Sequence, residues 1–563
     1  MNSPVTRLRG LRRLCLALAA LVVLPTAGLV GAGANPASAA VGSPLVGVAS
    51  GRCLDVAGNT DTLGTPLQIW DCNSQANQQF EFTAAGELRT FNSTRCVDAD
   101  NAGTTNGTVV LIWSCTGAAN QKWTQQSDGS IKGNQSGLCL DVNGAGTANG
   151  TKIILWTCSG AANQRWSVPS SSGALVIDAG TVVRPVTRVG SGFLYGLSDP
   201  NTPPVSIMQP LHINTVRQPP PGTEHRPNGV PAPVGDTLVI AANAKAVGAR
   251  ITVDMADIYD GFPYNWGGWT DWLARVDKMV AAAKARTDIT NIYAWEPWNE
   301  PDWTWSSSAG SWNDGWTRTY QQLRKSTSAP IMGPSFSYWS DSLMRSFLSS
   351  AKAAGTLPEV VSWHELRGWS GVDAHMRAYR AMEKDLGISA RPISINEYAT
   401  TDEIDVPSSV NHYIAQFERE GVADAERAFW YEAGTLNGLL YNGKPTASYW
   451  MYKWYGDQTG NVVKVTPTTY NDAVAAYDSS AKVVRAVVAG QSGNNSIRIN
   501  GLAAFGSSVT VTIDYVSGTG RTTNVSGSTR VSSTAYTVSG GSITVPINGQ
   551  DPYGAYNLVV TPR

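Results

Sequence analysis

Two glutamates stand where a chain rarely places charge, at the ends of short apolar runs. The segment Asn291–Pro301 begins like a buried strand and ends in Asn299, Glu300 and Pro301, and proline cannot continue a strand ladder. A second run, Ile-Ser-Ile-Asn-Glu, closes on Glu397. A carboxylate at the end of a buried strand is unusual unless a site lies there. We therefore predict that Glu300 and Glu397 share a site; the alternative is that both belong to ordinary ion pairs.

The region around these acids alternates strand-like runs with helical segments. We expect strands at residues 192–196, 214–217, 249–254, 291–298, 331–335, 360–364, 393–397 and 428–432. Eight such strands within residues 174–440, with helices between them, indicate a (β/α)8 TIM barrel. A doubly wound open sheet is the alternative, but no Gly-x-Gly-x-x-Gly turn follows an early strand.

In a barrel of this kind, functional groups gather where the strands end. The polar residues at those ends are Arg217, Asn299, Glu300, His364 and Glu397. Two carboxylates from separate strands suit glycosidic bond cleavage, in which one protonates the leaving oxygen and the other attacks the anomeric carbon. The double displacement of a retaining enzyme needs carboxyl groups about 5–5.5 Å apart, whereas inversion needs about 6.5–9.5 Å.

The motifs around the two acids resemble those of clan A glycoside hydrolases. Trp-Glu-Pro-Trp-Asn-Glu-Pro at 295–301 and Ser-Ile-Asn-Glu-Tyr at 394–398 look most like family 39 of that clan, which contains β-xylosidases, α-L-iduronidases and arabinose-releasing enzymes. The resemblance implies that Glu300 is the acid/base and Glu397 the nucleophile. It also implies that Asn299 bonds a substrate hydroxyl, and that Arg217 keeps the nucleophile ionised.

Other residues near the strand ends have weaker assignments. His364 is expected to line the pocket, with a hydrogen-bonded core histidine as the alternative, and Arg217 has a structural ion pair as its alternative. We place Trp298 and Trp430 among the substrate-binding residues and expect Glu296 to support the pocket from below. Further acids at strand ends are possible substrate contacts: Asp254, Asp257 and Glu365.

An internal repeat occupies residues 41–168. A Cys-x-Asp-x motif recurs every 43 residues, as Cys-Leu-Asp-Val, Cys-Val-Asp-Ala and Cys-Leu-Asp-Val. The Cys of each motif is followed 19 residues later by a second Cys. Each unit closes on Ala-Asn-Gln-x-aromatic, so one supersecondary unit is used three times. The natural disulfides are Cys53–Cys72, Cys96–Cys115 and Cys139–Cys158. Metal binding by these Cys is disfavoured because the region has no His.

This repeat resembles the ricin-type β-trefoil lectins, also called family 13 carbohydrate-binding modules. The resemblance implies that the Asp after the first Cys bonds sugar hydroxyls, the Trp before the second Cys stacks on the sugar, and the Asn assists. The implied residues are Asp55, Gln68, Trp70 and Asn77; Asp98, Trp113 and Asn120; and Asp141, Trp156 and Asn163. The family's Gln is kept only as Gln68, so the second and third pockets differ from the first. The alternative is that each Asp only orders a turn.

Both ends of the chain have distinct compositions. Residues 1–40 read as a secretory signal, with Arg7, Arg9, Arg12 and Arg13 before an apolar run and Ala-Ser-Ala at 37–39. A retained membrane anchor is the alternative. Residues 441–563 read as alternating strands with no helices, which predicts a β-sandwich. Residues 174–186 read as extended and are candidate strands of the same sandwich.

The composition of the chain indicates which classes of binding partner to expect. The 563 residues carry a formal net charge of −1, which favours neither nucleic acid nor an anionic membrane. Twenty Trp mildly favour sugar binding. We find no metal-ligand spacing, phosphate loop or nucleophile elbow, so no cofactor is expected. The sequence predicts a secreted retaining glycosidase acting on arabinose-, galactose- or xylose-containing plant-type glycans. The alternatives are a non-catalytic carbohydrate-binding protein with a scaffold barrel and an adhesive or toxin-like lectin.

Overall fold

The computed structural model describes residues 44–72, 75–83, 85–91, 93–126, 128–167, 174–223, 235–428 and 433–563. The predicted signal segment and the linker at 169–173 lie outside these residues. Within the described part of the chain, no helix combines the length and apolar character of a membrane span.

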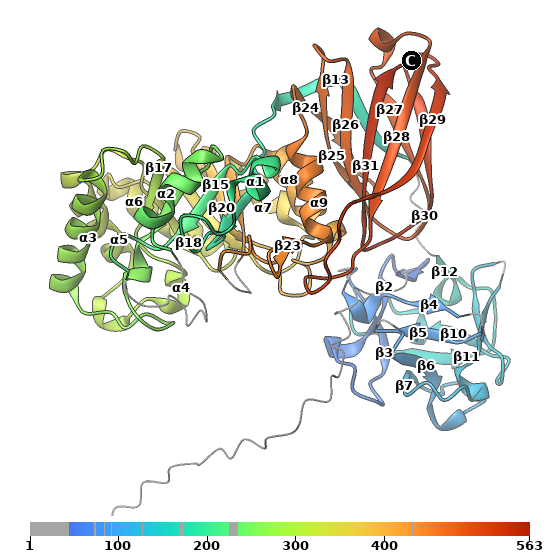
Figure 1. The fold of residues 1–563 in the computed structure, drawn as a ribbon. Helices are drawn as coiled ribbons and strands as arrows, with labels where there is room; N and C mark the ends of the chain where they lie inside the picture. Colours follow the sequence, from blue (N-terminus) through green and yellow to red (C-terminus); the bar gives the residue numbers. More distant parts are fainter. Residues whose placement is uncertain are drawn as a thin grey trace, which may run out of the picture. The chain divides into compact units, whose positions relative to one another are not determined.

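The N-terminal repeat folds as three similar units, as predicted (Figure 1). Each unit is a four-stranded antiparallel sheet, in the orders β12-β1-β2-β3, β4-β5-β6-β7 and β8-β9-β10-β11. The strands are β1 (Val46–Gly47), β2 (Cys53–Val56), β3 (Leu67–Trp70), β4 (Glu81–Phe82), β5 (Leu88–Thr90), β6 (Arg95–Ala99), β7 (Val110–Trp113), β8 (Trp123–Gln125), β9 (Ile131–Gly133), β10 (Cys139–Val142), β11 (Ile153–Trp156) and β12 (Trp166–Ser167). The three predicted disulfides are present. Pairing of the first and last strands closes the trefoil on itself.

The central region is a near-closed barrel of eight parallel strands in the order β17-β16-β15-β14-β21-β20-β19-β18. The strands are β14 (Gly192–Leu194), β15 (Thr215–Gln218), β16 (Arg250–Asp254), β17 (Ile292–Glu296), β18 (Met332–Phe336), β19 (Val360–Glu365), β20 (Ile393–Tyr398) and β21 (Asp424–Arg427). A parallel bridge between Trp295 and Ile331 joins the two edge strands. Strands such as β19 and β20 are buried along their whole length, as expected for parallel strands covered by helices.

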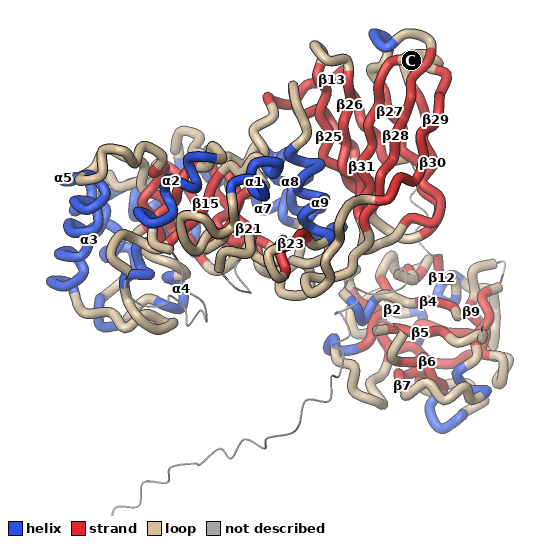
Figure 2. The backbone as a smooth tube through the Cα atoms, in the orientation of Figure 1, coloured by secondary structure: helices blue, strands red, loops and turns tan. Residues whose placement is uncertain are grey.

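Helices follow the strands and surround the barrel (Figure 2). They are α1 (Val205–Met208), α2 (Thr237–Ala246), α3 (Trp269–Lys284), α4 (Pro301–Thr304), α5 (Trp312–Ser326), α6 (Asp341–Ala354), α7 (Val372–Leu386), α8 (Pro407–Glu420) and α9 (Ala447–Gly456). At least one helix follows each barrel strand before the next barrel strand begins. After the last barrel strand, α9 precedes the C-terminal sheet.

Two expectations about the end of the barrel are wrong. The eighth barrel strand is Asp424–Arg427, which lies before the predicted range of 428–432; residues 429–432 lie outside the described part of the chain. Its sequence, Asp-Ala-Glu-Arg, is too polar to read as a strand, yet Asp424 and Glu426 are fully buried. Helices also do not stop after Asn442, because α9 follows. This helix is buried on nearly all sides, so it lacks the apolar stripe that marks a surface helix, and its many aromatic residues favour β structure.

The C-terminal region is a nine-stranded sheet in the order β29-β28-β31-β26-β25-β24-β13-β27-β30. Its strands are β13 (Leu175–Pro185), β24 (Asn461–Thr466), β25 (Asp472–Asp478), β26 (Val483–Ala489), β27 (Gly493–Asn500), β28 (Ser508–Val516), β29 (Thr529–Thr537), β30 (Ile543–Gln550) and β31 (Ala555–Pro562). Strands that are far apart in the sheet, such as β28 and β27, contribute side chains to one hydrophobic core. The sheet therefore curls on itself and forms a sandwich. The early strand β13 pairs with β24 and β27, so the chain enters this domain before it forms the barrel.

Candidate active site

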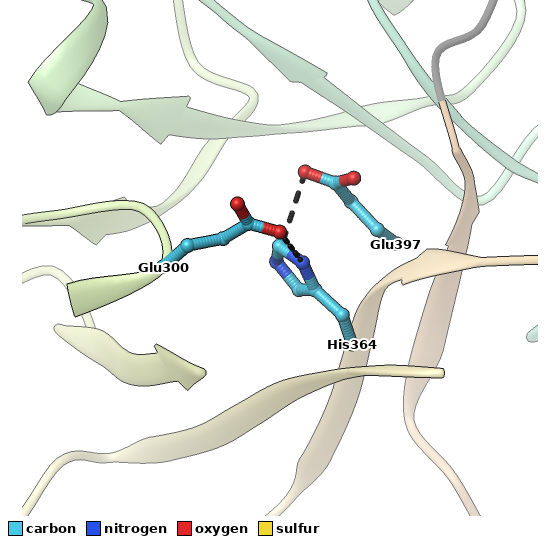
Figure 3. A group of neighbouring side chains, drawn as sticks. All are labelled: Glu300, His364 and Glu397. Atoms are coloured by element: carbon cyan, nitrogen blue, oxygen red, sulfur yellow. Dashed lines mark hydrogen bonds and ion pairs between the residues drawn. The ribbon is translucent and has the colours of Figure 1, made fainter. Parts of the chain in front are cut away.

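Glu300, His364 and Glu397 point toward one another at the carboxyl ends of β17, β19 and β20 (Figure 3). Nδ1 of His364 lies 3.0 Å from Oε1 of Glu300, and its Nε2 lies 3.7 Å from Oε1 of Glu397. One carboxylate oxygen from each glutamate and one ring nitrogen all lie within 4.8 Å of one another. The glutamates are 7% and 9% exposed, so both are nearly enclosed by protein. The structure thus brings together the two acids that were predicted to share a site, and their catalytic roles stay a prediction.

The backbone turns sharply at Glu300 to place its carboxylate. Glu300 adopts φ 50° and ψ 50°, a left-handed conformation that costs a residue with a side chain roughly 1–3 kcal/mol. Its backbone N–H donates to Ser335 O, and the Thr304 hydroxyl lies within hydrogen-bond distance of the carbonyls of Asn299 and Glu300. Pro301, whose φ suits the first turn of a helix, then starts α4. Local contacts therefore hold the strained turn.

Arg217 connects Glu397 to the buried acids Glu296 and Asp254. Its guanidinium is fully buried and donates to both carboxylate oxygens of Glu296 at 2.6 and 2.7 Å. It also donates to Glu397 Oε1 at 2.8 Å and to Asn299 Oδ1 at 3.0 Å. Asp254 lies 2.9 Å away as a third acidic partner. Arg217 therefore forms a structural ion pair and also lies beside Glu397, so the geometry contains both alternatives.

The charges of these groups depend on one another. Burial lowers the pKa of His364, but Glu397 and Glu300 outweigh it and the pKa lies above its usual value. Burial raises the pKa of Glu300, yet the hydrogen bond and charge of His364 outweigh it and the net direction is downward. Burial raises the pKa of Glu397 overall, against the opposing effects of His364 and Arg217. The ionised form of Glu397 thus relies on these two cations.

Two carboxylates and an imidazole are also a donor set for a divalent cation. The Arg217 guanidinium already occupies Oε1 of Glu397, and its charge repels a second cation there. The arrangement therefore suits acid–base chemistry better than metal binding.

The remaining predicted acids bind protein groups. Asp257 is fully buried, accepts from the hydroxyls of Tyr195 and Tyr264, and burial raises its pKa to about 7. Glu365 accepts from the Trp363 indole at 2.6 Å and contacts Nδ1 of His375 at 2.9 Å. These contacts favour a supporting role for both acids beside the pocket.

The aromatic residues divide into a buried cluster and an exposed rim. Trp298 is 1% exposed, donates to Thr304, and packs against Tyr264, Trp272 and Trp305, which favours packing over substrate contact. Trp430 lies outside the described residues. Trp303 was not singled out, yet its indole N–H donates to Glu300 Oε2 at 2.7 Å. Its position three residues after Glu300, on one helical turn, was the available signal.

The trefoil units repeat one side-chain arrangement. Asp55, Asp98 and Asp141 are nearly buried, and each accepts from the Asn and the Gln of its closing segment. Gln68 gives the first unit an additional donor, where the other two units have Leu111 and Ile154. The Trp of each unit is 41–45% exposed: Trp70, Trp113 and Trp156. Each unit thus presents an open indole beside an ordered carboxylate, and sugar binding there stays a prediction.

Comparison with known proteins supports both parts of this description. Residues 42–166 match the model of the ricin-type beta-trefoil lectin domain. The chain is 27% identical over 66% of its length to a 3-O-beta-L-arabinopyranosyl-alpha-L-arabinofuranosidase of Bifidobacterium pseudocatenulatum, and 28% identical over 69% to a 3-O-alpha-D-galactosyl-alpha-L-arabinofuranosidase of Bifidobacterium longum subsp. longum. These matches span 46% and 40% of the two relatives, so the chain covers less than half of their length.

Solved structures extend the comparison to the fold. The structure of N2152 from Neocallimastix frontalis is 35% identical, with a TM-score of 0.66 over 69% of this chain and 99% of that one. The GH39 enzyme from Xanthomonas axonopodis pv. citri shares the fold, at 14% identity and a TM-score of 0.50 over 69% and 97% of the two chains. The chain therefore carries a ricin-type β-trefoil lectin domain, and the rest of its described structure shares the fold of a family 39 glycoside hydrolase.

Proposed function

We propose that this protein is a retaining glycoside hydrolase in which Glu300 is the acid/base and Glu397 the nucleophile. The observation that carries the proposal is the approach of their carboxylate oxygens to within 4.8 Å. Double displacement needs about 5–5.5 Å between the carboxyl groups, whereas a water placed between them for inversion needs at least about 6.5 Å. The distance therefore favours direct attack by one of the two acids.

In the first step, Glu397 attacks the anomeric carbon while Glu300 gives its proton to the departing glycosidic oxygen. The products are a glycosyl ester on Glu397 and the free leaving group. In the second step, Glu300 takes a proton from water, and the resulting hydroxide displaces Glu397. His364 lies 3.0 Å from Glu300, so proton exchange between them across one hydrogen bond suits a group that alternates between acid and base.

The roles of the two glutamates follow from their partners. Glu397 has the Arg217 guanidinium at 2.8 Å, which stabilises the carboxylate that must attack. Glu300 has no such direct arginine contact in the described structure, and its proton balance is set by His364 and Trp303. A sugar that enters the site displaces water and so favours the neutral, proton-donating form of Glu300.

We infer the substrate class from the two relatives. Both are named for an α-L-arabinofuranoside that carries a second sugar at O3. We propose that this chain acts on plant-type polysaccharide side chains that contain arabinose, with galactose- or xylose-containing glycans as the wider class. We also propose that the protein is secreted after removal of residues 1–40; the three disulfides support this, because disulfides persist in oxidising compartments. The lectin domain would hold it on the polymer.

The test is product analysis on a panel of arabinogalactan, arabinan, xylan and uronate polymers, with Glu397→Ala and Glu300→Ala beside the wild type. We expect release of arabinose-containing sugars by the wild type and loss of several orders of magnitude in Glu397→Ala. Azide should restore the activity of Glu300→Ala on an activated aryl glycoside, because azide is already an anion and attacks the glycosyl ester without a general base. Activity that survives in Glu397→Ala would contradict the assignment of Glu397 as the nucleophile. An inactive wild type would favour the alternative of a non-catalytic carbohydrate-binding protein.

A further inference from the structure

Trp303 combines two properties that rarely occur together, an open ring face and a hydrogen bond to the proposed acid/base. Its side chain is 50% exposed, more than any other described Trp. Its indole N–H donates to Oε2 of Glu300 at 2.7 Å, while Nδ1 of His364 contacts Oε1. Each oxygen of Glu300 therefore has its own partner, and one of these partners lies at the surface.

The backbone fixes Trp303 relative to Glu300. Trp303 lies in the single turn of α4, and its backbone N–H donates to the carbonyl of Glu300 at 3.1 Å. The Thr304 hydroxyl contacts the same carbonyl. The ring is therefore bound to the glutamate at both the backbone and the side chain, so displacement of the ring also disturbs the carboxylate.

A second exposed aromatic ring supports Trp303 from the loop after β16. Phe262 is 39% exposed and packs edge-on against Trp303, with ring centroids 4.9 Å apart and an interplanar angle of 88°. Phe262 is in turn held by Tyr264, at 5.6 Å and 85°. Two loops thus build an apolar rim beside Glu300, although exposure of large apolar rings to water is unfavourable. A ligand with an apolar face would recover part of that free energy.

Other tryptophans of the same loop do not share this arrangement. Trp305 donates its indole N–H to Gly310 O and packs against Trp298, and Trp312 packs against Trp305. Their contacts are accounted for by the fold, whereas those of Trp303 leave half of the side chain open.

We propose that Trp303 is the platform for the sugar on the leaving-group side of the cleaved bond and also the positioning residue for Glu300. This inference rests on the proposed function. The acid/base must reach the glycosidic oxygen, so the leaving sugar lies next to Glu300 and within reach of an indole that bonds the same carboxylate. The ligand is a pyranose or furanose ring whose C–H face stacks on the indole.

The same contact affects proton transfer. An N–H donor stabilises a carboxylate, and the Trp303 hydrogen bond acts with that of His364 to lower the pKa of Glu300 against the effect of burial. The charged groups facing Glu300 are His364, Glu397 and Arg217, and none is altered by substitution at 303. Removal of the indole N–H alone should therefore raise the pKa of Glu300 and move to higher pH the limb of the kcat/KM profile that Glu300 controls, which is the acidic limb because the pKa of Glu300 is lowered and that of Glu397 is raised.

The experiment compares Trp303→Phe, Trp303→Ala and a matched control, Trp305→Phe, in the full-length protein. The substrates are a disaccharide and the methyl glycoside of the same glycon, as identified by the product panel. Both leaving groups need a proton, but only the disaccharide offers a ring to stack. We expect Trp303→Ala to lower kcat/KM for the disaccharide roughly ten-fold more than for the methyl glycoside, a ratio that corresponds to about 1.4 kcal/mol for the lost stacking contact.

Trp303→Phe keeps a platform but loses the N–H, so the substrate ratio should change less while the acidic limb, which Glu300 controls, moves to higher pH. Trp305→Phe should keep the wild-type ratio and pH profile. Equal losses on both substrates in Trp303→Ala would overturn the platform. A Trp303→Phe profile that superposes on the wild type would overturn the positioning role. Inactivity of the wild type on both substrates would instead count against the proposed function.

Discussion

The guanidinium of Arg217 and the carboxylate of Glu397 form a buried contact of 2.8 Å at the centre of the barrel. The same guanidinium binds Glu296 through two nitrogens and lies 2.9 Å from Asp254. One cation therefore holds three acids in place. Because burial raises the pKa of Glu397 and of Asp254, the charge of Glu397 depends on this arginine as well as on His364.

Replacement of Arg217 by Met should lower both the free energy of unfolding and the hydrolytic activity. Loss of one partner from a buried ion pair costs about 3–5 kcal/mol, because the remaining charges stay uncompensated. We expect the free energy of unfolding in urea to fall by about that amount at pH 7. Without the arginine, the acids must take up protons to remain buried, so the deficit should shrink as the pH falls. Arg217→Lys should recover part of the stability. A deficit that grows toward low pH would contradict this account.

Replacement of His364 by Asn should move the whole pH profile upward. His364 lowers the pKa of Glu300 and opposes the rise in the pKa of Glu397. Without its charge, both pKa values rise. Since kcat/KM requires protonated Glu300 and ionised Glu397, the basic and the acidic limbs both shift to higher pH. His412→Asn is the control, since His412 is buried against Trp369 and its pKa is lowered mainly by burial. An unshifted profile in His364→Asn would show that the imidazole only packs.

How far the sequence predicted this site depends on the range of the interactions. The strand-terminal positions of Arg217, Glu300, His364 and Glu397 follow from local patterns, and a barrel brings such positions together. The pairing of Arg217 with Glu296, Asp254 and Glu397 at once involves four different strands, which no local pattern encodes. The eighth strand was misplaced because Asp424 and Glu426 are polar but buried, and α9 was missed because burial on most of its sides removes its periodicity.

The trefoil makes separate predictions for its three exposed Trp residues. Trp70→Ala should weaken retention on an immobilised arabinose- or galactose-containing polymer, because the first unit alone has Gln68 beside its Asp. Trp113→Ala and Trp156→Ala should have smaller effects. Loss of one stacked ring corresponds to roughly ten-fold in affinity. Hydrolysis of a small soluble substrate serves as the control and should be unchanged in all three. Equal retention of Trp70→Ala and wild type would move the binding to the other units.

The disulfides should stabilise the trefoil through its unfolded state. Each closes a loop with a sequence separation of 19, for which loop entropy gives about 3 kcal/mol. The double substitution Cys139→Ser and Cys158→Ser should therefore lower the unfolding temperature of the trefoil. The measurement is Trp fluorescence during thermal unfolding of the full chain and of the isolated residues 41–168. Unaltered melting with intact secondary structure would show that packing of the repeats suffices.

The central claim is that Glu300 and Glu397 act by double displacement. The most direct measurement is proton NMR of the first sugar released from a substrate of known anomeric configuration, recorded before mutarotation. The separation within 4.8 Å predicts that the first product keeps the configuration of the substrate. A first product of the opposite configuration would contradict the account, since it would require a water between the two carboxylates.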